Sequence, residues 1–343
     1  MKISSLGEFG LIEKIRKSAI RSSSAVVVGI GDDAAALKVS TSLLLLATTD
    51  MLIEGVHFNL AYTDFYSLGW KSAAVNLSDI AAMGGIPRFC LTSLGIPPAF
   101  SVEQVYDFYQ GFNAVLRAHR TLLVGGDTCS SRYGLTVSIT VLGEVEKAHV
   151  LTRAGAKPGD RVFVTGNLGD SAAGLEILKH GVMGRGASRH NTVAKKLIEA
   201  HLRPAPRMKW GRTIALSRCA HAMIDISDGL SSDLGHICEQ SRVGAVIESG
   251  KIPLSLSLRK AAANLVNIPV YYALSGGEDY ELLFTTPPEK VKKLRSLGVP
   301  LYEIGEITRN RAMMILDHDG KQASLKATGY DHFAKKKSGV AHS

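Results

Sequence analysis

The stretch 76–85 constrains this chain most, because it sets a single carboxylate, Asp79, in a helical run of small and apolar residues that ends on two glycines. The helix predicted around it, over residues 66–83, is apolar on most faces and is therefore expected to be buried. A buried aspartate needs a partner such as an arginine, and no neighbouring residue supplies one. The run predicts a central helix whose charge must be neutralised from elsewhere.

Four further acidic clusters lie far from Asp79 in the sequence, each beside Gly, Ser or Thr in an apolar flank. They are Gly31-Asp32-Asp33, Thr48-Thr49-Asp50, Gly125-Gly126-Asp127-Thr128 and Asp225-Ile226-Ser227-Asp228-Gly229. Taken alone, one such cluster is better explained as a turn or a helix cap. Their repetition favours convergence on one site. Because oxygen ligands suit Mg²⁺ better than zinc, the pattern predicts magnesium, and with it phosphates.

Composition narrows the class of partner. The 343 residues suggest about two domains. A net charge of +9 is compatible with nucleic acid or with an anionic small substrate. Because Lys and Arg are spread along the chain and only 6% of residues are aromatic, without basic-aromatic alternation, dedicated nucleic-acid binding is not expected.

Neither a metal-binding cysteine pattern nor a targeting segment is visible. The cysteines at 90, 129, 219 and 238 form no CxxC pair and no His spacing completes a zinc site, which predicts free thiols in a reducing cytoplasm. The N-terminus lacks the pattern of a signal peptide. The longest aliphatic block, 43–47, is too short to span a bilayer and predicts a buried strand instead. We therefore expect a cytoplasmic protein with no membrane segment.

Several acidic residues are expected just past the ends of buried strands. Apolar runs predict strands at 25–30 before Asp32, at 43–49 before Asp50, and at 122–124 before the Gly-Gly-Asp motif. Neither half of the chain has a regular βαβ period, which favours α+β over a doubly wound sheet. A turn-rich joint at 151–160 indicates domains at 1–148 and 149–334, followed by a disordered tail at 335–343.

Common nucleotide-binding signatures are absent. Gly29-Ile30-Gly31 is followed by two carboxylates where a dinucleotide fingerprint needs helix amides. No GxxxxGK[ST] occurs, and the HRD and DFG signatures of protein kinases are missing.

Eight motifs, in order and over nearly the whole chain, resemble those of the thiamine-monophosphate kinases, a family in the superfamily of aminoimidazole ribonucleotide synthetase. They are Gly29-Ile-Gly-Asp-Asp33, Thr48-Thr-Asp50 with Gly55-Val-His-Phe58, Asn76-Leu-Ser-Asp79 through Met83-Gly84, Gly125-Gly-Asp-Thr128, Leu151-Thr-Arg153, Asp225-Ile-Ser-Asp-Gly229, Ser275-Gly-Gly-Glu-Asp-Tyr280 and Gly329-Tyr-Asp-His-Phe333.

The resemblance implies a fold and a reaction. An N-terminal α/β domain would pair its strands across a homodimer, and a C-terminal α+β domain would close over the nucleotide. ATP and thiamine monophosphate would give ADP and thiamine diphosphate by direct in-line transfer with several Mg²⁺ ions. No general base is assigned, because the acceptor is already an anionic phosphate oxygen.

The resemblance also assigns residues by matching position. The metal ligands would be Asp33, Thr48, Thr49, Asp50, Asp79, Asp127, Asp225 and Asp228, with Asp32 a weaker candidate. ATP would meet Tyr109, Gly126, Asp127, Arg153 and Ser227. Thiamine monophosphate would meet His57, Glu278 and Tyr330. Without the resemblance, Tyr109 is equally well read as a core or interface residue, His57 as a structural histidine, and Glu278 with Asp279 as a strand-end pair.

Other members of the superfamily compete less well. A selenophosphate synthetase needs a reactive cysteine near its N-terminus, and the first here is Cys90. A hydrogenase-maturation dehydratase ends in cysteine, whereas this chain ends in serine. Aminoimidazole ribonucleotide synthetase lacks the motifs at 275–280 and 329–333. A non-catalytic nucleotide-binding or nucleic-acid-binding protein is the alternative from a different class. The segment 181–190, expected to be mobile, and the lysine-rich end have no assigned role.

Overall fold

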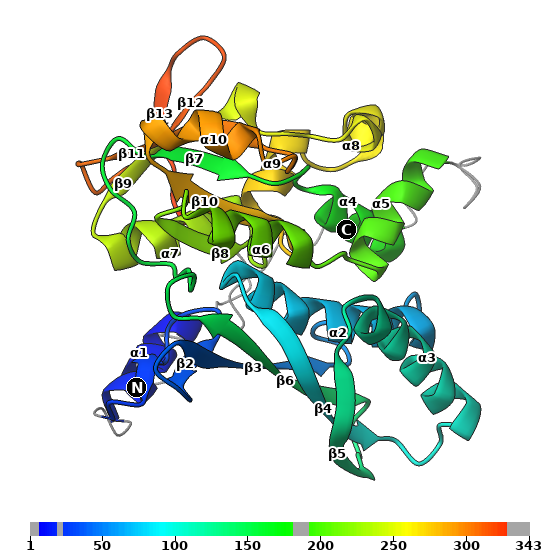
Figure 1. Cartoon of the computed structure of the whole chain (residues 1–343). Helices are drawn as coiled ribbons and strands as arrows, with labels where there is room; N and C mark the ends of the chain where they lie inside the picture. Colours follow the sequence, from blue (N-terminus) through cyan, green and yellow to red (C-terminus); the bar gives the residue numbers. More distant parts are fainter. Residues whose placement is uncertain (1–6, 19–22, 181–191, 328–343) are drawn as a thin grey trace.

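The computed structural model describes residues 7–18, 23–180 and 192–327 (Figure 1). Two mixed α and β layers lie one above the other, the N-terminal half below and the C-terminal half above in the view of Figure 1. The predicted tail, the segment 181–190 and Tyr330 lie outside the described residues. The division between residues 148 and 149 stays a prediction.

The N-terminal half is built on a six-stranded sheet. Its order is β1 (Val26–Val28), β2 (Ala35–Lys38), β3 (Leu43–Ile53), β6 (Thr136–Glu146), β4 (Ile86–Ile96) and β5 (Leu122–Ser130). Every pair is antiparallel except β4 with β5. Helices α2 (Phe65–Ala82) and α3 (Val102–Ala118) cover one face, and α1 (Gly7–Ser18) lies near the β2 edge (Figure 1).

Two strands are longer than the sequence predicted. β3 does not end before Asp50 but pairs with β6 along its whole length, from Leu43 opposite Glu146 to Ile53 opposite Thr136. β5 likewise continues through the Gly-Gly-Asp motif, which pairs with β4. The expectation that Asp50 and Asp127 follow strand ends is therefore wrong. The ladder continues because the partner strands extend beyond these positions.

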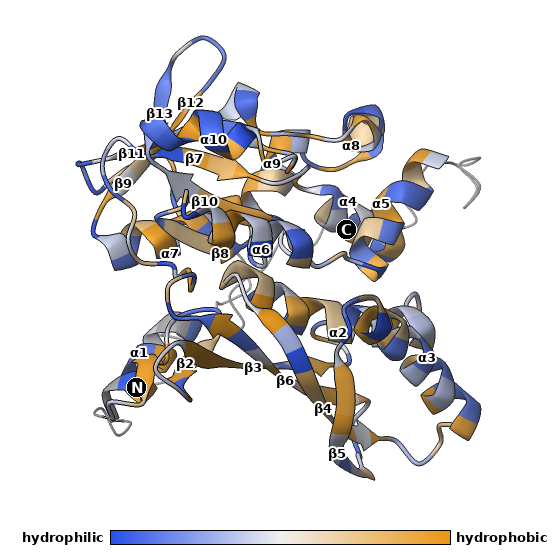
Figure 2. Ribbon diagram, in the orientation of Figure 1, coloured by the Kyte–Doolittle hydropathy of each residue, from blue (hydrophilic) through white to orange (hydrophobic). Residues whose placement is uncertain are grey.

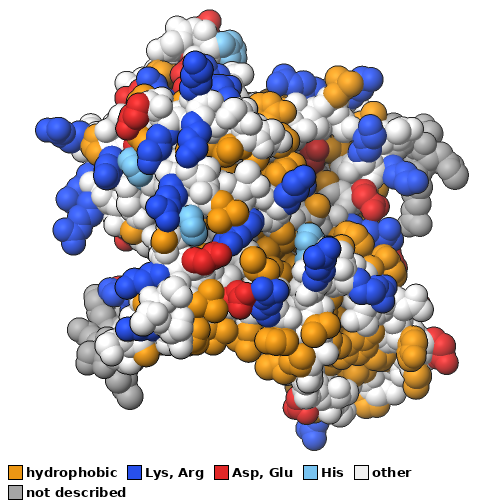
Figure 3. All heavy atoms as spheres, in the orientation of Figure 1, with side chains coloured by type: hydrophobic (Ala, Val, Ile, Leu, Met, Phe, Trp, Pro, Cys, Tyr) orange, Lys and Arg blue, Asp and Glu red, His pale blue; other side chains and the backbone are white. Residues whose placement is uncertain are grey.

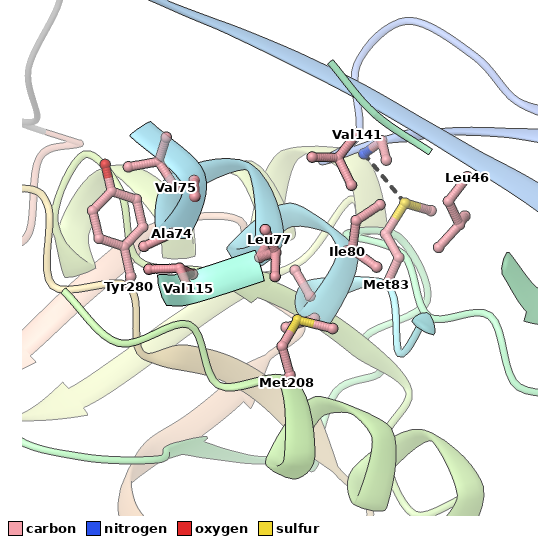
Figure 4. Packing of buried hydrophobic residues seen from close by; sticks show 14 of the residues in the cluster. Leu46, Ala74, Val75, Leu77, Ile80, Met83, Val115, Val141, Met208 and Tyr280 are labelled. Carbon is pink, nitrogen blue, oxygen red and sulfur yellow. Dashed lines mark hydrogen bonds between the residues drawn. The ribbon is translucent and has the colours of Figure 1, made fainter. Parts of the chain in front are cut away.

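Helix α2 is the centre of the structure, as its sequence predicted. All but four of its eighteen residues are buried. In Figure 4 its side chains lie between Leu46 and Val141 of the sheet on one side and Met208 of the upper layer on the other. Glycines permit its contact with α3, because a Cβ on Gly69 would lie 1.9 Å from the Phe108 carbonyl oxygen. The helix thus belongs to the cores of both halves.

The C-terminal half contains a seven-stranded sheet. Its order is β13 (Gln322–Ser324), β12 (Met313–Leu316), β9 (Gly244–Glu248), β11 (Tyr302–Thr308), β7 (Arg161–Val164), β10 (Leu282–Thr286) and β8 (Ala222–Asp225). Its helices are α4 (Asp170–His180), α5 (Thr192–Leu202), α6 (Met208–Ser217), α7 (Leu230–Ser241), α8 (Leu256–Ala261), α9 (Pro269–Ser275) and α10 (Val291–Arg295).

One face of the N-terminal sheet carries apolar side chains that no described residue covers. Opposite α2 and α3, and along edge strand β5, several large hydrophobic residues are exposed: Met51, Phe89, Leu91, Leu122 and Val124. Figure 2 shows hydrophobic segments along β5 and, between hydrophilic ones, along β4, and Figure 3 shows the apolar surface over this part of the molecule. No helix in the described part of the chain is long and apolar enough to cross a membrane.

Candidate active site

Three carboxylates from separate elements converge where the two halves meet. Asp33 follows Gly31 in the turn between β1 and β2, Asp79 lies in the last turn of α2, and Asp225 ends β8. One oxygen of each lies within 4.8 Å of the others. Asp33 and Asp225 are buried and Asp79 is half-buried. The predicted convergence of these three acidic motifs is present in the structure.

Strand β3 adds Asp50 and Thr48 to this group. The alternation of a strand places both on the same face, and the Thr48 hydroxyl donates to Oδ2 of Asp79 at 2.5 Å. The backbone N–H of Asp50 donates to Oδ1 of Asn76 at 3.1 Å, which ties the strand to α2. On the other side, the Ser78 hydroxyl donates to Oδ2 of Asp225 at 2.5 Å. Hydroxyl donors thus position the carboxylates of Asp79 and Asp225, and the amide oxygen of Asn76 holds the backbone of Asp50.

Burial and mutual repulsion raise the pKa values of these carboxyl groups. Burial and the nearby charge of Asp33 raise the pKa of Asp50 to about 6 and that of Asp225 to about 8. Burial, with Asp50 and Asp225 beside it, raises the pKa of Asp79 well above its usual range. A site that disfavours its own ionised state in this way takes up protons or, in their place, a cation.

Within the described ranges, Arg153 is the one cation that forms an ion pair with this group. It lies in the turn-rich segment 151–160 and donates to Oδ1 of Asp33 through Nε at 3.1 Å and Nη2 at 2.6 Å. Its backbone N–H donates to Oδ2 of Asp32 at 3.2 Å. Burial and the charge of Asp33 raise the pKa of Asp32 to about 7. One guanidinium therefore faces several carboxyl groups.

The donor set fits a hard divalent cation. Oδ2 of Asp33 is buried and has no hydrogen-bond partner in the described part of the chain. An orphaned buried carboxylate oxygen is costly unless a cation meets it. Oxygen donors at close range, without sulfur, suit Mg²⁺.

Asp228 lies in a neighbouring group. An oxygen of Asp228 lies within 4.8 Å of ligand atoms of Asp233 and His236. Oδ2 of Asp233 accepts the backbone N–H groups of Asp228 at 3.2 Å and Gly229 at 3.1 Å, which fixes the loop at the start of α7. Ser227, in the same loop, accepts the backbone N–H of Glu278 at 2.7 Å.

Other predicted site residues lie away from the carboxylates. Asp127 is exposed on β5, three strand spacings or about 14 Å from β3. The Thr49 hydroxyl faces the opposite side of β3 from Thr48 and donates to the Ile139 carbonyl at 2.9 Å. Gly126 must be glycine, because a Cβ would lie 1.8 Å from the Thr92 carbonyl oxygen. Within one chain, the structure does not bring Asp127 or the Thr49 hydroxyl to the cluster.

Tyr109 packs in the helical layer. Its ring meets Phe108 and Phe112 edge-on, with centroids 5.4 and 6.2 Å apart, and burial raises the pKa of its hydroxyl. These contacts agree with the core reading of this tyrosine, and its role towards adenine stays a prediction.

The two described residues predicted to meet the substrate lie in tight turns. His57 follows β3, and its Nδ1 accepts the backbone N–H of Ile53 at 2.9 Å, which leaves the proton on Nε2. Glu278 has a left-handed backbone with φ +66° and forms an ion pair with Lys71 at 2.9 Å. The sequence reasoning missed Lys71. Its signal was a lysine in the middle of a helix that was otherwise predicted to be buried.

Comparison with known proteins places the chain in a family. Residues 31–145 match the family AIR synthase related protein, N-terminal domain, and residues 157–316 match its C-terminal domain. The chain is 38% identical over 333 residues to the thiamine-monophosphate kinase of Bacillus subtilis, covering 96% of this chain and 100% of that relative. It is 40% identical over 334 residues to the thiamine-monophosphate kinase of Escherichia coli strain K12, covering 96% and 98%. The solved structure of AaThiL complexed with AMPPCP and TMP matches with a TM-score of 0.85 at 37% identity, covering 97% of this chain and 99% of that one.

Proposed function

We propose the chemistry of this site from one premise: the chain belongs to the AIR synthase related family and, within it, to the thiamine-monophosphate kinases. The protein uses ATP to phosphorylate thiamine monophosphate, which yields ADP and thiamine diphosphate. The resemblance read from the eight motifs and the predicted α+β fold are thereby confirmed.

The observation that carries the mechanism is the convergence of Asp33, Asp79 and Asp225, with Asp50 near enough to feel the charge of Asp33 and, among the described residues, one guanidinium paired with the group. These four carboxylates would hold Mg²⁺, and Asp228 would hold a further ion. Bound magnesium neutralises phosphate oxygens and so permits two anionic substrates to approach. The hydroxyl of Thr48 and that of Ser78 orient the ligands Asp79 and Asp225.

The protein's own groups act by positioning. Arg153 would leave Asp33 and direct its fork of donors to the ATP phosphates, with Gly126, Asp127, Ser227 and Tyr109 as the other proposed nucleotide contacts. His57 and Glu278 would meet thiamine monophosphate, as would Tyr330. The acceptor phosphate oxygen is already an anion, so no group needs to remove a proton. Transfer is direct, and labelled covalent phosphoprotein during turnover would contradict it.

Turnover with defined substrates tests the function. ADP release should require Mg-ATP together with thiamine monophosphate, and neither thiamine nor an aminoimidazole precursor should replace it. Asp50→Asn should abolish this release, because it removes one ligand of the carboxylate group. ATP binding without turnover on any of these substrates would contradict the proposed activity and leave the fold unaffected.

We also propose that the protein is a homodimer joined through the uncovered face of its N-terminal sheet. The hydrophobic side chains of that face and the unpaired edge of β5 would be costly to leave in water. Thr49 and Asp127 lie on this face and edge, so a second copy would lie beside both. Light scattering should give twice the mass of one chain.

A charge on the uncovered face tests the dimer. Leu91→Glu should shift the protein to the mass of one chain, because it buries an unpaired carboxylate in the interface. Leu256→Glu, at a position 67% exposed in the C-terminal half, is the matched control and should leave the mass unchanged. A dimer that survives Leu91→Glu would place the interface elsewhere.

A further inference from the structure

A second group of buried charges includes Lys71, about two helical turns before Asp79 on α2. The Lys71 side chain is only 3% exposed, and its Nζ donates to Oε1 of Glu278 at 2.9 Å. The same Nζ lies 3.5 Å from Nε2 of His201, on α5. Nδ1 of His201 lies 3.2 Å from Oε2 of Glu278. Both oxygens of one carboxylate are therefore held, each by a different element.

The protonation states follow from these contacts. An ammonium can only donate, so Nε2 of His201 accepts from Lys71 and Nδ1 carries the proton, with the Ser171 hydroxyl at 3.1 Å and Oε2 of Glu278 at 3.2 Å as its neighbours. Burial and the neighbouring Lys71 charge lower the pKa of His201, which keeps the imidazole neutral. Lys71 and His201 hold the pKa of Glu278 well below its usual range despite its burial. The network is one cation, one anion and one neutral ring.

The backbone around Glu278 is also held in a fixed conformation. Glu278 and Tyr280 both have left-handed backbones, at φ +66° and +51°, a strained conformation for residues with a side chain. Their N–H groups donate to the carbonyls of Ser227 at 2.7 Å and Ile226 at 2.8 Å. The strained turn is thus fixed on the segment that carries Asp225 and Asp228. It places Glu278 next to the acidic cluster.

The carboxylate is the open member of this network. The Glu278 side chain is 27% exposed, whereas Lys71 is 3% and His201 2% exposed. A carboxylate has about four lone-pair positions, and two are used here. Burial and, to a lesser degree, the charge of Glu278 raise the pKa of Tyr62, in the segment that follows His57. An ion pair that served only to stabilise the fold would not need a carboxylate that is partly exposed to solvent.

We propose that Lys71 and His201 are positioning residues, which hold the Glu278 carboxylate ionised and in one orientation for the cationic, N–H-bearing heteroaromatic part of the phosphate acceptor. The inference rests on the proposed function, since it takes thiamine monophosphate as that acceptor. Thiamine supplies both features, a charged thiazolium and an aminopyrimidine with N–H donors. Lys71 and His201 act through Glu278 and do not touch the phosphates.

Binding measured for each substrate separately tests this inference. Lys71→Met and His201→Gln should each weaken thiamine monophosphate binding by about tenfold or more, the equivalent of about 1.4 kcal/mol. Binding of the ATP analogue AMPPCP with Mg²⁺ should stay within about twofold of the parent value. Calorimetry on the full chain gives both constants, and steady-state kinetics should show the same split between the two KM values.

The matched control is Arg212→Met. Arg212 of α6 forms an ion pair with Glu146 of β6, at 2.7 and 2.6 Å, and so joins the two halves as Lys71 does but away from Glu278. It should leave both binding constants within about twofold. Equal loss of both substrates in the Lys71 and His201 variants, or parent-like binding of thiamine monophosphate, would overturn the proposal. If Lys71→Met does not fold, His201→Gln decides by the same criteria.

The parent protein separates this inference from the proposed function. Thiamine monophosphate binding that depends on Lys71 and His201, without turnover, would overturn the kinase activity and support the positioning role. No binding of thiamine monophosphate by the parent protein would overturn both.

Discussion

Two groups of buried charge lie on α2, and they are neutralised in opposite ways. Asp79, near the end of the helix, joins Asp33, Asp50 and Asp225 against a single guanidinium. Lys71 lies eight residues earlier, about 12 Å along the helix axis, and is matched by Glu278. The first group is incomplete without an added cation, whereas the second is complete within the chain.

This difference in charge balance assigns a different role to each group: the acidic cluster binds a cation, and the Lys71 group positions Glu278. Repulsion among the carboxylates is a cost to the empty protein, which a cation converts into binding energy. The ion pair of Lys71 with Glu278 stabilises the fold even when no substrate or metal is bound. Substitutions in the two groups should therefore change stability in opposite directions.

The largest expected effect comes from Asp79→Asn. Turnover should fall by about 10²–10³-fold, since one ligand of the metal site is lost. The melting temperature in EDTA should rise, because the amide removes a repelled carboxylate. Steady-state kinetics and thermal unfolding measure both. A lower melting temperature in EDTA would mean that the carboxylates are already satisfied within the chain.

Lys71→Met should change stability in the opposite direction and destabilise the protein. It leaves the Glu278 carboxylate largely buried and unpaired, and should lower the free energy of unfolding by about 3 kcal/mol. Urea unfolding measures the loss. Adding Glu278→Met in the same chain should restore most of it, since the lone charge is then removed. Unchanged stability in Lys71→Met would show that the pair is solvated.

The smallest effect is expected at Thr48. Thr48→Val removes the hydroxyl that donates to Asp79 and should cost about 1 kcal/mol, or about fivefold in the Mg²⁺ concentration that gives half-maximal turnover. Thr140→Val is the matched control, because its hydroxyl bonds to Thr49 on the other face of the sheet. Equal shifts in the two variants would contradict the role of Thr48.

The sequence predicted features that depend on a residue and its immediate neighbours. It did not predict features that depend on how far two strands pair. The buried helix around Asp79 and its convergence with Asp33, Asp50 and Asp225 followed from carboxylates in apolar flanks. The face of Thr49 follows from alternation within the predicted strand 43–49, whereas the place of Asp127 depends on β5 continuing through the Gly-Gly-Asp motif, which its own sequence does not reveal.

The network of Lys71, His201 and Glu278 was not predicted from the sequence, for a different reason. Lys71 and Glu278 are 207 residues apart and meet only because α2 contacts both halves of the protein. The sequence around neither residue predicts that the two are in contact. A lysine within a helix predicted to be buried does, however, require a distant acid, and that inference was available from the sequence.

The most direct test of the central claim is the stability of the protein against pH, with and without Mg²⁺. A carboxyl group whose pKa is raised by folding contributes stability below its unfolded value of about 4, and that stability is lost as pH rises through the folded value. The folded values are about 6 for Asp50 and about 8 for Asp225.

In EDTA, the melting temperature should therefore fall between about pH 5 and about pH 8.5. Millimolar Mg²⁺ should raise it strongly at the higher pH and little at the lower, because only ionised carboxylates bind the ion. Asp79→Asn should flatten both responses. A melting temperature at about pH 8.5 that does not respond to Mg²⁺ would contradict the claim that this cluster is a cation site.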